Sequence, residues 1–198
     1  MEEELDYVER KIREYYDNIW SPPILIRDRV DNPLLGFHYG FYEKGIKNRE
    51  EAAINMNDYV GRLLNLDNRK GRIIDLGCGI GSTIIYLAMK YPNIKFFGIT
   101  LATSEINFAE KLQREKQVKN AEFILGNFVK TNFSDEYFDG VYALESFCYA
   151  LNKKYLCNEM KRILKSGGKL VIIDGFFKDN SLTSFMQIFY KSLLQHIP

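Results

Sequence analysis

The sequence lacks three features that would place it in a class at once: paired metal-ligand cysteines, a strong net charge and a long apolar run. Cys78, Cys148 and Cys157 stand at no metal-ligand spacing, which indicates reduced thiols in a cytoplasmic protein and no metal centre. Lysine and arginine number 27 against 26 acidic residues, so the net charge of +1 gives no reason to expect nucleic acid or an anionic membrane as a partner. Residues 2–4 are acidic where a secretory signal is basic, and no stretch approaches the roughly 18 apolar residues of a membrane span.

The sequence contains enough hydrophobic residues to form the core of one domain. Of its 198 residues, 46% are hydrophobic, which excludes a disordered chain. The aromatic share of 14% suits an apolar pocket, although an aromatic-rich core explains it equally well. Composition therefore favours a globular domain and leaves its ligand open.

Two predicted helices, at 4–19 and 48–64, precede a regular alternation of strands and helices that starts at residue 72. The predicted strands cover 72–76, 95–100, 122–125, 138–144 and 169–174, and the predicted helices cover 81–90, 104–117 and 153–165. Ser166-Gly167-Gly168 is predicted to cap the last of these helices. The alternation predicts a doubly wound α/β protein with a parallel sheet, whose ligands sit at the carboxyl ends of the strands.

The main motif is the run Asp75-Leu76-Gly77-Cys78-Gly79-Ile80-Gly81, which leads from the first strand of the alternation into a helix. Its glycines allow a tight turn and a close approach of a ligand to the main chain. A dinucleotide fingerprint would place its third glycine at position 82, which is Ser82. The carboxylate of Asp75 would repel a pyrophosphate but pairs well with the ammonium group of a methionine-like ligand. A plain glycine turn is the alternative interpretation.

This run resembles motif I of the class I S-adenosylmethionine-dependent methyltransferases, and the resemblance extends over roughly residues 36–177. It implies a Rossmann-like parallel sheet and S-adenosylmethionine as the cofactor. The cofactor-binding residues that it implies are Tyr39, Asp75, Gly77, Cys78, Gly79, Gly81, Thr100, Leu101, Glu105, Asn127, Phe128 and Leu144.

The segment 98–105 resembles the G-I-T-L-S-x-x-Q segment of the branch that contains cyclopropane fatty acid synthases and tocopherol and sterol C-methyltransferases. Ala102 replaces the usual serine and Glu105 the usual glutamine. Glu105 still accepts hydrogen bonds from ribose hydroxyls, or it simply favours the N-terminus of its helix.

Asn127 stands where the family usually has an acidic residue close to the adenine amino group. Its amide keeps an acceptor oxygen, so adenine recognition is expected to survive. Phe128 is expected either to lie against the adenine face or to pack in the core.

The segment 143–150 resembles the part of the sterol and terpenoid-diphosphate C-methyltransferases in which a glutamate faces the substrate. Glu145 is therefore the first catalytic candidate, for stabilising a developing cation or taking up a proton; capping or ion pairing is its alternative role. Tyr149 is the second catalytic candidate, because it stands where sterol enzymes carry histidine. The segment 37–42 resembles the aromatic-glycine loop over the cofactor, in which Tyr39 reaches the methionine carboxylate. His38 is a third catalytic candidate, with a structural hydrogen bond as its alternative.

We expect a helical cap and cofactor-covering loop at 1–70, a cofactor-binding core at 71–177 and the start of a truncated lid at 178–198. The core would lack the last two strands of its relatives, and 181–194 reads as an amphipathic helix. An exposed fifth strand or C-terminal helix predicts a homodimer.

The expected reaction is methyl transfer to a small, apolar molecule, with C-methylation favoured over N- or O-methylation. Two alternatives remain at this stage. One is a non-catalytic S-adenosylmethionine-binding partner of a larger enzyme. The other is a nicotinamide-dependent oxidoreductase, which Gly81 and Thr100 disfavour.

Overall fold

A computed structural model of the chain describes residues 2–19 and 36–176, so the predicted helix at 181–194 lies outside the described residues. The helices and helical turns are α1 (Glu2–Glu14), η1 (Tyr15–Ile19), α3 (Arg49–Leu63), η3 (Leu66–Asn68), α4 (Ser82–Lys90), α5 (Thr103–Glu115), η4 (Phe147–Tyr149) and α6 (Lys153–Ile163). The strands are β1 (Gly71–Leu76), β2 (Ile94–Thr100), β3 (Ala121–Leu125), β4 (Phe138–Leu144) and β5 (Leu164–Ile173). Within these ranges no helix has both the length and the apolar character needed to cross a membrane.

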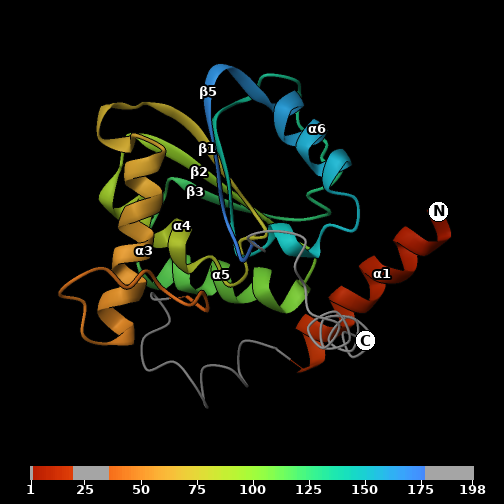
Figure 1. Cartoon of the computed structure of the whole chain (residues 1–198), viewed down its shortest axis with the longest axis horizontal. Coiled ribbons are helices and arrows are strands. Elements are labelled where there is room, and N and C mark those ends of the chain that lie inside the picture. Colours follow the sequence, from red (N-terminus) through yellow and green to blue (C-terminus); the bar gives the residue numbers. More distant parts are fainter. Residues whose placement is uncertain (1, 20–35, 177–198) are drawn as a thin grey trace.

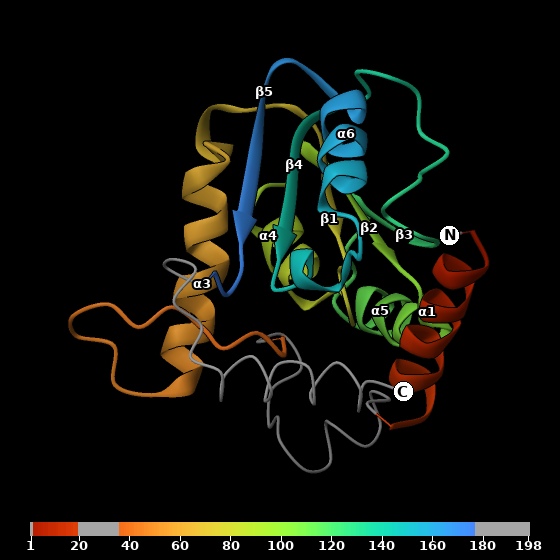
Figure 2. The ribbon, with the colours of Figure 1, turned by 45° about the vertical axis from the view of Figure 1, so that its right-hand side comes forward.

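The described strands form one parallel sheet in the order β3-β2-β1-β4-β5. The chain winds outward from β1 in one direction through β2 and β3, and then in the other through β4 and β5. This confirms the predicted doubly wound, Rossmann-like sheet, in which a ligand crevice forms where the winding direction changes. The carboxyl ends of the strands lie on the side of the molecule where α1 and α5 lie (Figures 1 and 2).

Two hydrophobic clusters cover the two faces of the sheet. Helices α3, α4 and α5 contribute to one cluster, and α6 contributes to the other. Ile73 and Ile74 of β1 belong to different clusters, because successive side chains of a strand point to opposite faces. Figure 2 shows α3 and α6 on opposite sides of the sheet.

Helix α3 anchors the aromatic-glycine segment 36–42 beside the carboxyl ends of the strands. The helix starts at the N-cap residue Asn48. The amide of Phe41 donates to the carbonyl of Ala52 at 2.9 Å, and the Asn55 side chain donates to the carbonyl of Phe41 at 2.9 Å. Because Ala52 is completely buried, this segment is fastened to the same core as the sheet.

The predicted glycine cap of α6 is wrong. The helix ends at Ile163, and Leu164 already has extended backbone and pairs with Phe138 of β4. The ladder then shifts its register before it resumes at Lys169, so Ser166-Gly167-Gly168 forms the irregular start of β5. Gly167 has φ +74°, a left-handed conformation that glycine adopts readily and that this bulge uses.

Strand β5 lies at one edge of the sheet that the described residues form, as the sequence predicts. Its residue Leu170 is 44% exposed although it lies in an apolar strand. An edge of this kind presents main-chain groups to which another strand can pair.

Candidate functional site

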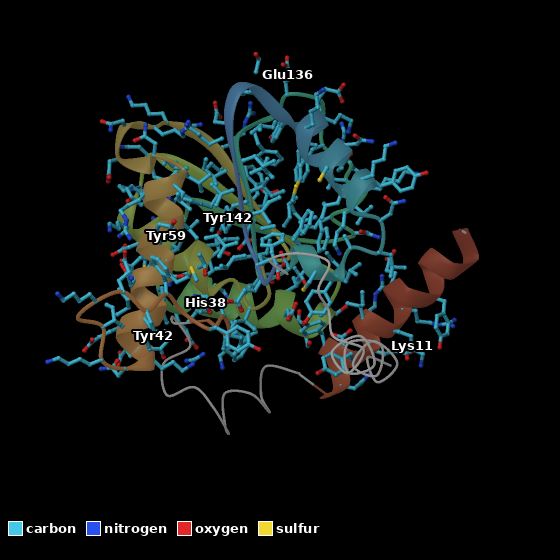
Figure 3. The ribbon with its side chains drawn as sticks, in the orientation of Figure 1. Lys11, His38, Tyr42, Tyr59, Glu136 and Tyr142 are labelled. Atoms are coloured by element: carbon cyan, nitrogen blue, oxygen red, sulfur yellow. The ribbon has the colours of Figure 1, made fainter. Side chains whose placement is uncertain are left out.

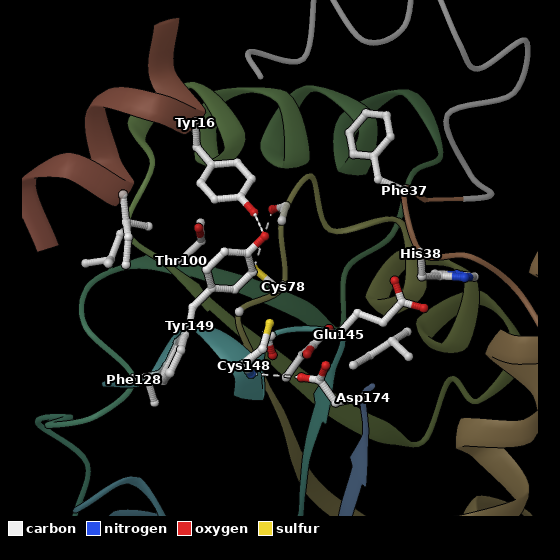
Figure 4. Close-up of a pocket in the computed structure, with 18 of the residues that line it drawn as sticks. Tyr16, Phe37, His38, Cys78, Thr100, Phe128, Glu145, Cys148, Tyr149 and Asp174 are labelled. Carbon is white, nitrogen blue, oxygen red and sulfur yellow. Dashed lines mark hydrogen bonds between the residues drawn. The ribbon is translucent and has the colours of Figure 1, made fainter. Parts of the chain in front are cut away.

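A cavity of about 1910 Å³ opens at the carboxyl ends of the strands. The glycine run after β1, the ends of β2, β4 and β5, the segment 36–42 and residues of α1 and η1 line it. Figure 4 shows how these elements, which lie far apart in the sequence, surround one space. Among the predicted cofactor-binding residues, all except Gly81 line this cavity: Tyr39, Asp75, Gly77, Cys78, Gly79, Thr100, Leu101, Glu105, Asn127, Phe128 and Leu144.

The glycine run turns sharply between β1 and α4. The amides of Gly77 and Cys78 both donate to the carbonyl of Ile99, at 2.9 and 3.1 Å. Gly81 has φ +75°, and a Cβ there would lie 2.5 Å from the ring of Phe123, so only glycine fits. Gly81 therefore packs the loop against its neighbours, while Gly79 faces the cavity.

Asp75 places a carboxyl group at the floor of the cavity. The residue is 3% exposed, and its Oδ1 has no hydrogen-bond partner in the described part of the chain. Tyr142, which pairs with Asp75 in the β1–β4 register, is fully buried (Figure 3). Burial raises the pKa of Asp75 to about 8, and the interaction with the Tyr142 hydroxyl partly offsets this effect. A buried carboxyl group with a free acceptor fits the ammonium group of an amino-acid ligand.

Glu105 lies in the first turn of α5, five residues after the end of β2 and facing the glycine run. Its Oε2 accepts a hydrogen bond from the Thr100 hydroxyl at 2.5 Å. Burial raises the pKa of Glu105 to about 7, and the Thr100 hydrogen bond partly offsets this effect. A Cβ at Gly79 would lie 3.8 Å from the Oε1 atom, which shows that this oxygen faces the loop. The position suits a ribose hydroxyl, and it also lies in the first turn of α5, so both predicted roles remain.

Asn127 and Phe128 follow β3 at another part of the cavity wall. The Asn127 side chain donates to Oε2 of Glu9 at 3.0 Å and accepts from the amide of Val129 at 2.8 Å. Phe128 is 8% exposed, and it belongs to a core cluster as well as to the cavity wall. Its two predicted roles are therefore compatible.

Glu145 lies directly after β4 in a strained conformation, with φ +52°. Both of its carboxylate oxygens accept from the amide of Tyr39, at 3.0 and 3.2 Å. The half-buried carboxyl group has its pKa raised by burial, and the nearby Asp174 raises it further. Figure 4 shows Glu145 and Asp174 side by side at the ends of β4 and β5. Asp174 is a cavity residue that the sequence analysis did not select.

His38 is not an open-loop histidine. It is 7% exposed, and its Nε2 lies 3.1 Å from Oδ1 of Asn57, which also accepts from Thr83. Burial lowers the pKa of His38 to about 4. The side chain is therefore neutral at physiological pH and a weak base, which favours the structural alternative over catalysis.

The Tyr39 side chain is 84% exposed, so it stands at the rim of the cavity and not inside it. The structure brings its main-chain amide, rather than its ring, into contact with the candidate catalytic residue Glu145.

Tyr149 faces the helical turn η1, which directly follows α1. Its hydroxyl accepts a hydrogen bond from the Tyr16 hydroxyl at 2.6 Å, and the two rings meet edge to face (Figure 4). Tyr16 and Glu9 bring the N-terminal helix into the cavity wall, which the sequence analysis did not foresee. The helical spacing of residues 4–19 predicts the helix but not its contact with the cavity.

The described residues contain no group of three or more histidine, cysteine or acidic side chains placed to hold a metal ion.

Comparisons with known proteins agree with this architecture. A family model described as a methyltransferase domain matches residues 67–192. Norajmaline N-methyltransferase from Rauvolfia serpentina is 27% identical over 178 residues, which cover 83% of this chain and 58% of that protein. The 24-methylenesterol C-methyltransferase 2 of Oryza sativa subsp. japonica is 31% identical over 136 residues, which cover 68% of this chain and 37% of that protein.

A solved structure has the same fold. It is geranyl diphosphate C-methyltransferase from Streptomyces coelicolor A3(2), in complex with Mg²⁺, geranyl diphosphate and S-adenosyl-L-homocysteine. The TM-score is 0.72 at 17% identity, and the match covers 94% of this chain and 72% of that one. The chain spans less than two thirds of the length of the two curated relatives.

The raised pKa of Asp75 predicts how stability depends on pH. The folded protein holds a proton on this group up to about pH 8, whereas the unfolded chain loses it near the ordinary value of 3.8. The free energy of unfolding should therefore fall as the pH rises from 6.5 to 8, by about 1–2 kcal/mol from this group. The raised pKa of Glu105 lowers the free energy of unfolding in the same direction. The lowered pKa of His38 changes the free energy of unfolding only below about pH 6.5, outside this range.

Urea unfolding at a series of pH values checks this prediction. The variant Asp75→Asn has no proton to lose, so its stability should fall less between pH 6.5 and 8 than that of the unaltered protein. Parallel curves for the two proteins would contradict it.

Proposed function

We propose that this chain, which belongs to the methyltransferase domain family, binds S-adenosylmethionine in the cavity and transfers a methyl group to a small, apolar acceptor. The observation that carries the proposal is the buried carboxyl group of Asp75, which lines the cavity with the glycine run and whose Oδ1 makes no hydrogen bond of normal geometry in the described residues. The cofactor would supply a methyl group on a sulfonium, which is ready for in-line displacement.

Different residues of the cavity would bind the methionine, ribose and adenine portions of that cofactor. Asp75 would accept the ammonium group of the methionine portion, and Gly79 would let the chain approach it closely. Glu105 would accept from the ribose, with Thr100 holding its carboxylate in place. The adenine would lie at Asn127 and Phe128.

Glu145 is the proposed catalytic residue. Its carboxylate is held by the Tyr39 amide at the carboxyl end of β4, close to Asp174. The two carboxylates place negative charge where a cation develops when a carbon–carbon double bond attacks a methyl group. This favours C-methylation, and Glu145 could then take up the proton that restores the double bond. Among the two curated relatives, one is named as an N-methyltransferase and one as a C-methyltransferase.

Calorimetry tests the cofactor. S-adenosylmethionine and S-adenosylhomocysteine should bind, and nicotinamide dinucleotides should not. Asp75→Ala removes a charge-assisted contact of about 1.5–3 kcal/mol, so the affinity should fall by roughly one to two decades. Tight binding of NAD without binding of S-adenosylhomocysteine would overturn the proposal.

Glu145→Gln tests the catalytic role, because it keeps the shape of the side chain and an acceptor for the Tyr39 amide. The acceptor is first identified from the mass of the product formed with labelled cofactor and a metabolite extract. Turnover of that acceptor should then fall by about 10²–10⁴, while cofactor affinity changes little. Unchanged turnover, or a loss confined to cofactor binding, would assign Glu145 another role.

We further propose that two chains associate through the edge strand β5, where Leu170 is 44% exposed. A lysine at this position should block strand pairing. Light scattering should show a dimer for the unaltered chain and a monomer for Leu170→Lys. The control Met89→Lys changes a residue on α4 that is 53% exposed and should remain dimeric. A monomeric unaltered chain refutes the proposal.

A further inference from the structure

Helix α1 contributes a carboxylate to the cavity. Oε2 of Glu9 accepts from the Asn127 side chain at 3.0 Å, and Oε1 accepts from Arg13 at 3.2 Å. Glu9 also lines the cavity, together with Ile12 of the same helix. The contact joins residues 118 positions apart in the sequence.

The segment that carries Glu9 is held on the core by polar contacts. None of its described side chains belongs to either hydrophobic cluster of the sheet. Instead Asp17 accepts from the amide of Ser104 at 2.8 Å, and Tyr16 donates to Tyr149 at 2.6 Å. Tyr16 and Tyr149 both line the cavity, as does Glu9, so the segment is placed to touch what the cavity binds.

The strand order fixes which end of the proposed cofactor lies near Glu9. Asp75 belongs to the central strand β1, while Glu145 follows β4 on one side of it. Thr100 ends β2 and Asn127 follows β3 on the other side. A ligand whose ammonium group meets Asp75, and whose reacting methyl group faces Glu145, must extend its purine toward β2 and β3. Glu9 stands there.

The hydrogen-bond capacity of this corner singles out Glu9 as an acceptor. A carboxylate offers about four lone-pair sites, of which the described contacts of Glu9 use two. The oxygen of Asn127 already accepts from the amide of Val129 at 2.8 Å, which leaves it one lone-pair site against about two on Glu9. The exocyclic amino group of adenine is a donor with two hydrogens, and it needs an acceptor with free sites.

We propose, resting on the proposed function, that Glu9 accepts a hydrogen bond from the adenine amino group, with Asn127 positioning its carboxylate. Helix α1 then forms part of the cofactor site and selects an amino group over a carbonyl at that ring position. A ring carbonyl would face the carboxylate with two acceptors and no hydrogen between them.

Calorimetry with two ligands tests this inference. The first is S-adenosylhomocysteine, and the second is S-inosylhomocysteine, in which a ring carbonyl replaces the amino group. The unaltered chain should prefer the first. In Glu9→Ala the affinity for S-adenosylhomocysteine should fall roughly tenfold to a hundredfold. The affinity for S-inosylhomocysteine should stay the same or rise, so the preference collapses.

Glu14→Ala is the matched control. Glu14 lies on the same helix and pairs with Lys11 at 3.3 Å, but it does not line the cavity. This variant should keep both affinities and their ratio. It shows that any collapse in Glu9→Ala does not follow from a general change in the charge or stability of α1.

The outcomes separate the inference from the proposed function. An equal loss of both affinities in Glu9→Ala would show a structural role only and overturn the inference. An unchanged preference would overturn it as well. If neither ligand binds the unaltered chain, the proposed function fails and the inference fails with it, whereas binding with an unaffected ratio refutes the inference alone.

Discussion

The site depends on one constraint, which is the burial of the Asp75 carboxyl group at the end of the central strand. A carboxyl group that is 3% exposed and has an acceptor without a partner is costly unless it is protonated or receives a cation. The sheet buries this position, because β1 lies between β2 and β4 and its carboxyl end points into the crevice. The glycine run that follows leaves the space above the carboxyl group open. The buried carboxyl group lowers the stability of the free protein, but it forms a binding site for a positively charged ligand.

Three further acidic residues of the cavity extend the same electrostatic pattern. Glu105, Glu145 and Glu9 come from different elements and share one cavity with Asp75. Each is held by a donor from another part of the chain: Thr100, the amide of Tyr39, and Asn127. Their orientation is thus set by the fold before a ligand arrives. Acidic side chains held in these positions favour a cofactor with an ammonium and a sulfonium group, and a reaction in which positive charge develops.

The sequence predicts the strands and the glycine run well because both signals are local. Spacing and β-branched residues identify β1 to β4, and the glycines at 77, 79 and 81 permit few alternatives. The start of β5 was mispredicted, because pairing of Leu164 with β4 overrides the local glycine signal. The burial of His38 and the exposure of Tyr39 could not be predicted, because they depend on how the loop packs on α3. Glu9 and Tyr16 reach the site through contacts that no local pattern encodes.

The protonation state of Asp75 is the most direct test of this account. A carbon-13 NMR titration of its side-chain carboxyl, with and without S-adenosylhomocysteine, reports the group itself. The account predicts a pKa near 8 in the protein alone. It predicts a pKa well below that value in the complex, where the ligand ammonium group stabilises the carboxylate. A carboxyl group that is already ionised at pH 6 without ligand, or whose pKa the ligand does not change, would contradict the account.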